Sequence, residues 1–163
     1  MADSPSASDS PSESNAAPAS DSPSAADPTA HHVGVTVSDL DRAVEFYTDT
    51  FDLDIVAEFS VSGEAFAEAV AVDGASAEFA HLDAGGAIVE LVAYDPRGKP
   101  ESDPELNRPG TVHLGLSVDD VDAFYTALDD GVTTLSPPRT TSSGTTILFV
   151  VDPDGNRIEV LDA

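Results

Sequence analysis

The chain has 163 residues and no cysteine, which excludes disulfides, zinc–thiolate sites and thiol nucleophiles. Its formal net charge is −25, and such a surface repels nucleic-acid phosphate and anionic membranes, so neither is expected as a partner. In molar salt the Debye length falls to about 3 Å and the chain's self-repulsion is screened, which predicts a halophilic protein.

Residues 1–30 are predicted to be a disordered acidic tail. The tetrapeptide DSPS occurs three times there, and Ser, Pro, Ala and Asp dominate. A segment of this composition cannot bury enough apolar surface to offset the entropy lost on ordering. The sequence shows no signal peptide and no apolar run long enough to cross a membrane, so a cytoplasmic protein is expected.

The remainder, 31–163, is predicted to be one domain made of two similar modules. The first module spans 31–94 and the second spans 111–163. A polar connector at 95–110, with four Pro and two Gly, joins them.

The first module is predicted to contain one main helix and four strands. Val33, Val35 and Val37 alternate with smaller or polar residues, and Asp39 is a good N-cap for an amphipathic helix. The Val side must pack under that helix, so His32 faces away from it. The expected elements are a strand at 32–38, a helix at 40–51, a strand at 53–60, a short helix or covering loop at 63–71, and strands at 76–83 and 86–94.

The second module repeats this order. Asp119 or Asp120 caps its helix, which carries Val121, Phe124 and Leu128 and stops near Gly131. The expected strands are 111–118, 132–136, 144–151 and 156–162. The fold class is therefore α+β, with the arrangement β-α-β-β-β in each module.

Two sequence motifs occur once in each module. HVGVTVSDLD at 32–41 matches HLGLSVDDVD at 113–122, and DAGGAIVEL at 83–91 matches DPDGNRIEV at 152–160. Each module thus opens with a His on a strand and closes with a Glu on a strand.

The repeated His and Glu predict a metal site. The residues are His32, Glu90, His113 and Glu159. A Glu in the middle of an apolar strand is costly to bury unless it is paired or binds a metal. Imidazole and carboxylate donors suit Mn, Fe, Co, Ni or Zn, and the sequence does not distinguish among these.

The other two histidines of the folded part are expected not to bind the metal. His31 adjoins His32 and should point to the opposite face of the strand. His81 aligns with Val150 of the second module, which indicates a core or surface role.

These motifs resemble those of the vicinal oxygen chelate (VOC) superfamily, which includes glyoxalase I, methylmalonyl-CoA epimerase, extradiol dioxygenases and bleomycin-binding proteins. The resemblance covers 31–163. It implies two βαβββ modules that form a cupped eight-stranded mixed sheet with helices on its outer face. It also implies one divalent metal ion per site.

The ligand order His, Glu, His, Glu resembles that of glyoxalase I, a lactoylglutathione lyase. This implies a metal-dependent lyase or isomerase that transfers a proton through a metal-bound enediolate. The substrate would be a small oxo compound or its hemithioacetal with a low-molecular-weight thiol, as in methylglyoxal detoxification. By the same resemblance Glu159 is the base, with Glu90 as the alternative. The site lies within one chain or across a homodimer.

Three other functions remain open. They are an isomerase like methylmalonyl-CoA epimerase, an enzyme like the extradiol dioxygenases, and a non-catalytic small-molecule binding protein. The chain departs from glutathione-dependent glyoxalase I at Thr36 and Tyr94, where that enzyme has Arg and Asn. The first module also carries twelve extra residues, assigned to the segment around 61–74, which could cover the mouth of the cup.

Overall fold

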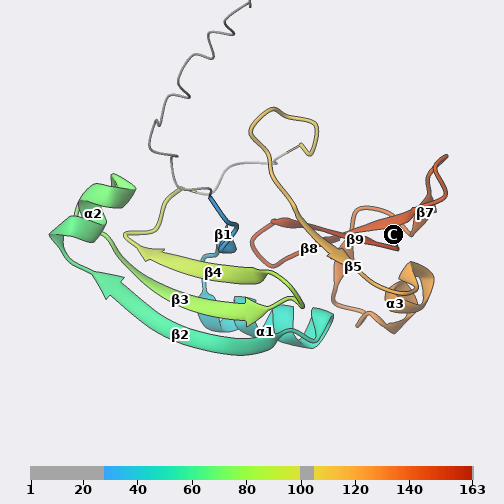
Figure 1. Ribbon diagram of the computed structural model, residues 1–163, viewed down its shortest axis with the longest axis horizontal. Helices are drawn as coiled ribbons and strands as arrows, with labels where there is room; N and C mark the ends of the chain where they lie inside the picture. Colours follow the sequence, from blue (N-terminus) through green and yellow to red (C-terminus); the bar gives the residue numbers. More distant parts are fainter. Residues whose placement is uncertain (1–27, 100–104, 163) are drawn as a thin grey trace, which may run out of the picture.

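The computed structural model describes residues 28–99 and 105–162, which form two modules side by side (Figure 1). The tail that the sequence predicts to be disordered spans residues 1–30, and residues 1–27 of it lie outside the described residues. The first module contains β1 (His32–Thr36), α1 (Leu40–Phe51), β2 (Asp54–Ser62), α2 (Glu64–Val70), β3 (Ser76–Asp83) and β4 (Ile88–Asp95). The second contains β5 (Leu114–Ser117), α3 (Val121–Ala127), β6 (Thr133–Thr134), β7 (Arg139–Thr140), β8 (Thr146–Val151) and β9 (Arg157–Leu161).

Each module folds its strands into one mixed sheet. The first sheet has the order β1-β4-β3-β2, and only the pairing of β1 with β4 is parallel. The second has the order β5-β9-β8-β6, again with its first strand parallel to its last, and β7 also pairs with β8. The predicted α+β class with two related modules is therefore confirmed.

Helix α1 begins and ends as the sequence predicts. The side chain of Asp39 accepts a hydrogen bond from the Arg42 amide at 3.0 Å, which satisfies an amide that the first turn leaves free. At the other end Asp52 adopts the left-handed conformation and its amide bonds to the Thr48 carbonyl. Of the two candidate caps of the second helix, Asp119 and Asp120, it is Asp120 that accepts a hydrogen bond from the Ala123 amide, at 2.8 Å.

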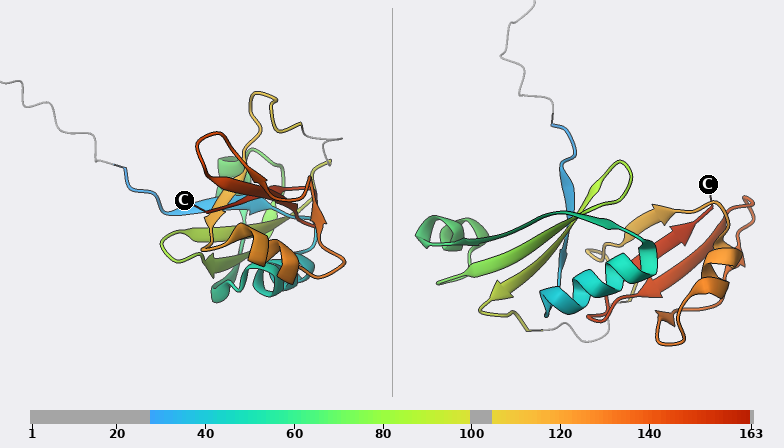
Figure 2. Two further views of the ribbon diagram at one scale, coloured as in Figure 1. Left: turned by 90° about the vertical axis from the view of Figure 1, so that its right-hand side faces the viewer. Right: turned by 90° about the horizontal axis from the view of Figure 1, so that it is seen from below.

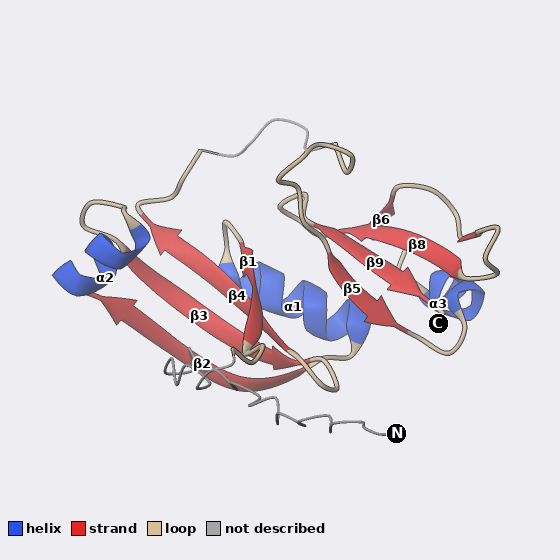
Figure 3. Cartoon of the chain, turned by 45° about the horizontal axis from the view of Figure 1, so that its top comes forward, coloured by secondary structure: helices blue, strands red, loops and turns tan. Residues whose placement is uncertain are grey.

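The helices cover the faces of the sheets that carry the alternating aliphatic residues. Ala43 and Tyr47 of α1 are fully buried against this surface, as is Val121 of α3. Seen from below, α1 runs along the underside of the first sheet toward the second module (Figure 2, right). Strand alternation places His81, Glu90 and Glu159 on the opposite, front faces of the sheets, because their neighbours Leu82, Leu91 and Ile158 belong to the core. Neither α1 nor α3 lies over these front faces (Figure 3).

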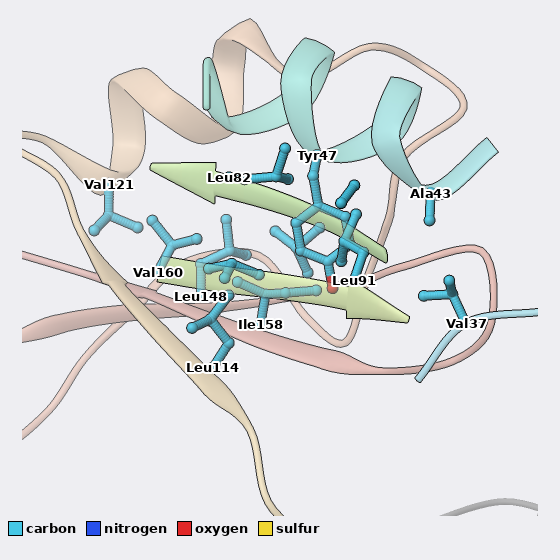
Figure 4. Packing of buried hydrophobic residues seen from close by; sticks show 13 residues of the cluster. Val37, Ala43, Tyr47, Leu82, Leu91, Leu114, Val121, Leu148, Ile158 and Val160 are labelled. Carbon is cyan, nitrogen blue, oxygen red and sulfur yellow. The ribbon is translucent and has the colours of Figure 1, made fainter. Parts of the chain in front are cut away.

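One hydrophobic core joins the two modules (Figure 4). It combines Leu82 and Leu91 from the first sheet with Leu148 and Ile158 from the second. Phe51 and Phe124 stack in parallel across the boundary, with ring centroids 5.9 Å apart. The two modules are therefore packed against each other through a common core.

Several predicted strands are shorter in the structure, and the two in the second module that lose most are those predicted at 111–118 and 132–136. Strand β5 starts at Leu114, because the preceding Val112 has no ladder partner and is 82% exposed. The predicted strand at 132–136 pairs with β8 over only two residues.

Candidate functional site

The first predicted His–Glu pair lies on the front face of the first sheet. Parallel pairing of β1 with β4 sets Gly34 opposite Glu90, and His32 lies two residues earlier on the same face. His32 Nε2 lies 3.4 Å from Glu90 Oε1. A β-carbon added at Gly34 would lie 3.9 Å from that oxygen, which is an ordinary van der Waals contact.

The second pair is built in the same way. Strand β5 pairs with β9 so that Gly115 faces Glu159, and His113 lies just before β5 begins. His113 Nε2 lies 3.1 Å from Glu159 Oε2. In each module the predicted His ligand is therefore in contact with the predicted Glu ligand of the same module.

His81, for which the sequence predicts a core or surface role, lies beside the first His–Glu pair. In the β3–β4 ladder His81 is directly opposite Glu90, and its Nε2 lies 2.7 Å from Glu90 Oε2. The sequence alignment with Val150 was wrong by one residue, because the residue opposite Glu159 is Phe149. A one-residue offset in a strand places a side chain on the other face, which is why the interpretation missed His81.

His31 also differs from expectation. Its ring lies 5.1 Å from that of His32 and 6.5 Å from that of His81, so it is on the same side as these histidines. Strand alternation does not govern His31, because β1 begins one residue later.

Three side chains form a group with the geometry of a partial metal site. One donor atom each from His32, His81 and Glu90 lies within 4.8 Å of the others. The donors are two imidazole nitrogens and a carboxylate oxygen, which fit a first-row divalent metal. Across residues 28–99 and 105–162, His113 and Glu159 are not members of this group, so the four predicted ligands do not converge within one chain.

An aromatic surface continues from the first group toward α2. Phe59 packs edge-on against the His81 ring at 5.1 Å and stacks on Phe79 at 4.9 Å. Phe66 of α2 stacks on Tyr94 at 6.3 Å. The inserted segment thus covers the outer end of this face.

A prominent hollow of the described chain does not coincide with the His and Glu residues. A hollow of about 780 Å³ lies at the outer end of the first sheet, where Ser38, Ser60, Glu78, Tyr94 and Arg97 contribute to its lining. It contains none of the four predicted ligands. The two His–Glu pairs instead lie on open faces, with 38% of the His32 side chain and 42% of the His113 side chain exposed.

The chain belongs to the glyoxalase/bleomycin resistance protein/dioxygenase superfamily, whose family model matches residues 29–160. Enzymes of this superfamily commonly use a divalent metal, and the His/Glu group is a possible site for one. In the described residues, no helix is both long and apolar enough to cross a membrane.

A curated relative and two solved structures indicate the range of similar proteins. The chain is 30% identical over 142 residues to a 2-epi-5-epi-valiolone epimerase of an Actinomyces species, covering 81% of this chain and 78% of the relative. A glyoxalase family protein of Bacillus cereus matches with a TM-score of 0.71 at 18% identity, covering 85% of this chain and 97% of the other. The trypanothione-dependent glyoxalase I of Leishmania major matches with a TM-score of 0.58 at 21% identity, covering 83% and 87%.

Proposed function

We propose that this protein is a divalent-metal-dependent lyase or isomerase that moves a proton on the carbon next to a carbonyl group of a small oxo compound. The observation that supports this is the pair of matched His–Glu contacts, one on the front face of each sheet. A single contact between a His and a Glu often arises by chance. Here each module has one, and in each the Glu lies opposite the Gly two residues after the His, which indicates that both pairs serve the same site.

The ligands in this proposal are His32, Glu90, His113 and Glu159, and the ion is Ni, Co, Zn, Mn or Fe. When bound, such an ion polarises a carbonyl group and stabilises the negative charge that proton removal leaves behind. The protein's part is to hold two imidazoles and two carboxylates in fixed positions while leaving room for two substrate oxygens. Gly34 and Gly115 lie opposite Glu90 and Glu159 and bring no side chain to these positions.

The proposal includes a homodimer that completes the site. In one chain the donors of the first pair and those of the second do not form one group. Both pairs lie on exposed faces, and the apolar ring of Phe59, which packs beside the first pair, is 42% exposed. A second copy with two-fold symmetry would bring His32 and Glu90 of one chain to His113 and Glu159 of the other, twice over.

Mixing two inactive variants tests this arrangement. His32→Gln disables the first module and His113→Gln disables the second, and each homodimer should be inactive. Random exchange of subunits puts two intact modules together in one site of each mixed dimer, so about a quarter of wild-type activity should return. A mixture that exchanges subunits but stays inactive would show that each site lies within one chain.

We assign the role of base to Glu159. In the described part of the chain Glu90 contacts two of the histidines, His32 and His81, whereas Glu159 contacts only His113. Glu159 is also the more exposed carboxylate, at 24% against 13%. A carboxylate with fewer contacts is the one that can turn toward a substrate proton. Glu159→Gln should lower turnover by about 10²-fold or more; a variant that keeps its metal and full turnover would refute the assignment.

The site allows two outcomes of proton transfer. Return of the proton to the same carbon on its other face is an epimerisation, and the 30% identical relative is an epimerase. The supply of six basic residues against 31 acidic ones also favours a substrate without several anionic groups. Return of the proton to the neighbouring carbon is the glyoxalase I reaction, favoured by the His, Glu, His, Glu order.

Metal analysis and an assay panel separate these candidates. One divalent ion per site, with turnover of a small hydroxy-ketone and none of methylglyoxal–thiol mixtures, would support the epimerase. The reverse pattern would support the lyase. Purified protein without stoichiometric metal and without metal-restored activity would favour a non-catalytic binding protein and refute the proposal.

The working environment we propose is one of high ionic strength. Only 6 of the 163 residues are Lys or Arg, and the net charge of −25 is spread over a small protein. Such a charge is tolerated best where salt screens it.

A further inference from the structure

The two modules differ at one position beside the site. In the first sheet the residue opposite Glu90 is His81, and in the second the residue opposite Glu159 is Phe149. Phe149 packs against the ring of His113 at 5.5 Å but has no hydrogen-bonding atom to offer Glu159. Both modules share the His–Glu contact, but only the first module adds a polar side chain, His81, opposite the Glu.

His81 and His32 contact different oxygens of Glu90. His81 Nε2 lies 2.7 Å from Oε2, which is the distance of a charge-assisted hydrogen bond. His32 Nε2 lies 3.4 Å from Oε1. The two rings lie 6.0 Å apart, and each thus reaches one side of the carboxylate.

The surroundings of His81 keep its ring in place. Its side chain is 16% exposed, and Phe59 packs against it edge-on at 5.1 Å. Lateral movement toward β2 is blocked by that ring, while β4 lies on the other side. A ring held in this way can fix the orientation of the group that it touches.

We propose that His81 is a positioning residue for Glu90: its Nε2–H donates to Oε2 and leaves Oε1 as the single oxygen available to a metal. This inference rests on the proposed function, in which Glu90 is a ligand. A ligating carboxylate whose second oxygen is held by a hydrogen bond cannot swing to a bidentate position.

This role also explains the difference between the two carboxylates. Glu90 is tied by a histidine from β3, whereas the corresponding residue next to Glu159 is an apolar phenylalanine. The first module then supplies the rigid ligand and the second supplies the carboxylate that is free to act as a base.

The test is the affinity of the full-length protein for cobalt(II), with His81 replaced in two ways. His81→Phe inserts the residue that the second module has and removes the donor, and cobalt should bind about 10- to 100-fold more weakly. His81→Gln keeps an N–H donor and should bind within about threefold of wild type. The visible spectrum of the cobalt protein should show the same coordination number in wild type and in His81→Gln.

Phe149→Leu is the matched control, since it alters the equivalent ring without removing a donor. It should leave cobalt affinity within about threefold of wild type. Equal weakening by Phe149→Leu and His81→Phe would show a packing effect and overturn the proposal. X-ray absorption that loses one imidazole in His81→Gln would show that His81 is a ligand and would also overturn it.

The same titration separates this inference from the proposed function. If wild type binds no cobalt, the metal site and the role of His81 both fail. If wild type binds cobalt and His81→Phe binds it equally well, the metal site stands and the role of His81 alone is wrong.

Discussion

At the scale of single residues, Asp152 is the buried charged residue of the described chain. It is 4% exposed and begins the turn between β8 and β9. Its carboxylate accepts hydrogen bonds from the amides of Asp154 and Asn156, from the Asn156 side chain and from the Tyr47 hydroxyl. Burial raises the pKa of Tyr47 above its ordinary range, and the charge of Asp152 raises it further.

Removing this carboxylate should be strongly destabilising. Asp152→Ala leaves one buried and three partly buried donors without an acceptor, and the free energy of unfolding should fall by about 3 kcal/mol. Tyr47→Phe removes only the longest of the bonds, 3.3 Å, and should cost about 1 kcal/mol. Urea unfolding measures both, with the exposed Asp130→Ala as the control; equal stability of Asp152→Ala and the control would contradict the prediction.

Asp154 gives a prediction about pH. Burial alone would raise its carboxyl pKa, but hydrogen bonds from Ser38 and the charge of Arg42 outweigh burial and hold the pKa below its usual 3.8. The folded state therefore binds this proton less readily than the unfolded chain. The stabilisation is complete above pH 3.8 and is lost as the pH falls through the lower folded pKa.

The measurement compares wild type with Asp154→Asn in urea at a series of pH values. The difference in unfolding free energy should be constant from about pH 7 to pH 5 and at most about 1 kcal/mol, because the Arg42 side chain is half exposed. It should shrink below about pH 4. A difference that grows with acid would mean that the carboxylate is not the stabilised form.

At the scale of elements, the local sequence predicted the ends of helix α1 but not the register in which the strands pair. The ends of α1 followed from Asp39 and the apolar stripe, and both are local in the sequence. The position of His81 depends on the length of the turn between the last two strands of each module. Glu90 pairs with His81, nine residues before it, whereas Glu159 pairs with Phe149, ten residues before it. No local motif encodes that difference, and it decides which face a side chain occupies.

The inserted helix α2 should be held by its aromatic contacts. Phe66 stacks on Tyr94 and meets Phe79 edge-on, at 6.3 Å in each case, and no residue of α2 is fully buried. Phe66→Ala should free the helix while lowering overall stability by only about 1 kcal/mol. Hydrogen exchange should then quicken in the amides of α2 and stay unchanged in α1.

The exposed Glu68→Ala is the control for that experiment, because it alters α2 without touching the sheet. Its exchange rates should match those of wild type. If Phe66→Ala also leaves α2 protected, the helix is held by its backbone connections and not by the aromatic stack.

At the scale of the whole molecule, the sequence predicted two equivalent modules but not their placement. The repeat contains each module's register, so both His–Glu contacts followed from it. The core that joins the modules depends on how the helix-covered faces of the two sheets pack against each other. The stack of Phe51 on Phe124 is a contact between the modules that the repeated motifs do not contain. Symmetry in the sequence therefore predicted four ligands and left open whether they meet within one chain or across a homodimer. In the described chain they form two separate pairs.

Net charge also acts on the molecule as a whole. With a net charge of −25 on 163 residues, acidic groups repel one another across distances near the Debye length of about 10 Å at 0.1 M salt. At 1 M that length is about 3 Å, so the melting temperature should rise by at least ~5 °C between 0.1 M and 1 M KCl. A variant with five exposed Asp changed to Asn should melt higher in dilute buffer and gain less from salt, whereas a preferential exclusion effect would leave both salt slopes equal. A wild-type melting temperature that does not rise would refute screening as the source of stability and, with it, the assignment to a high-salt environment.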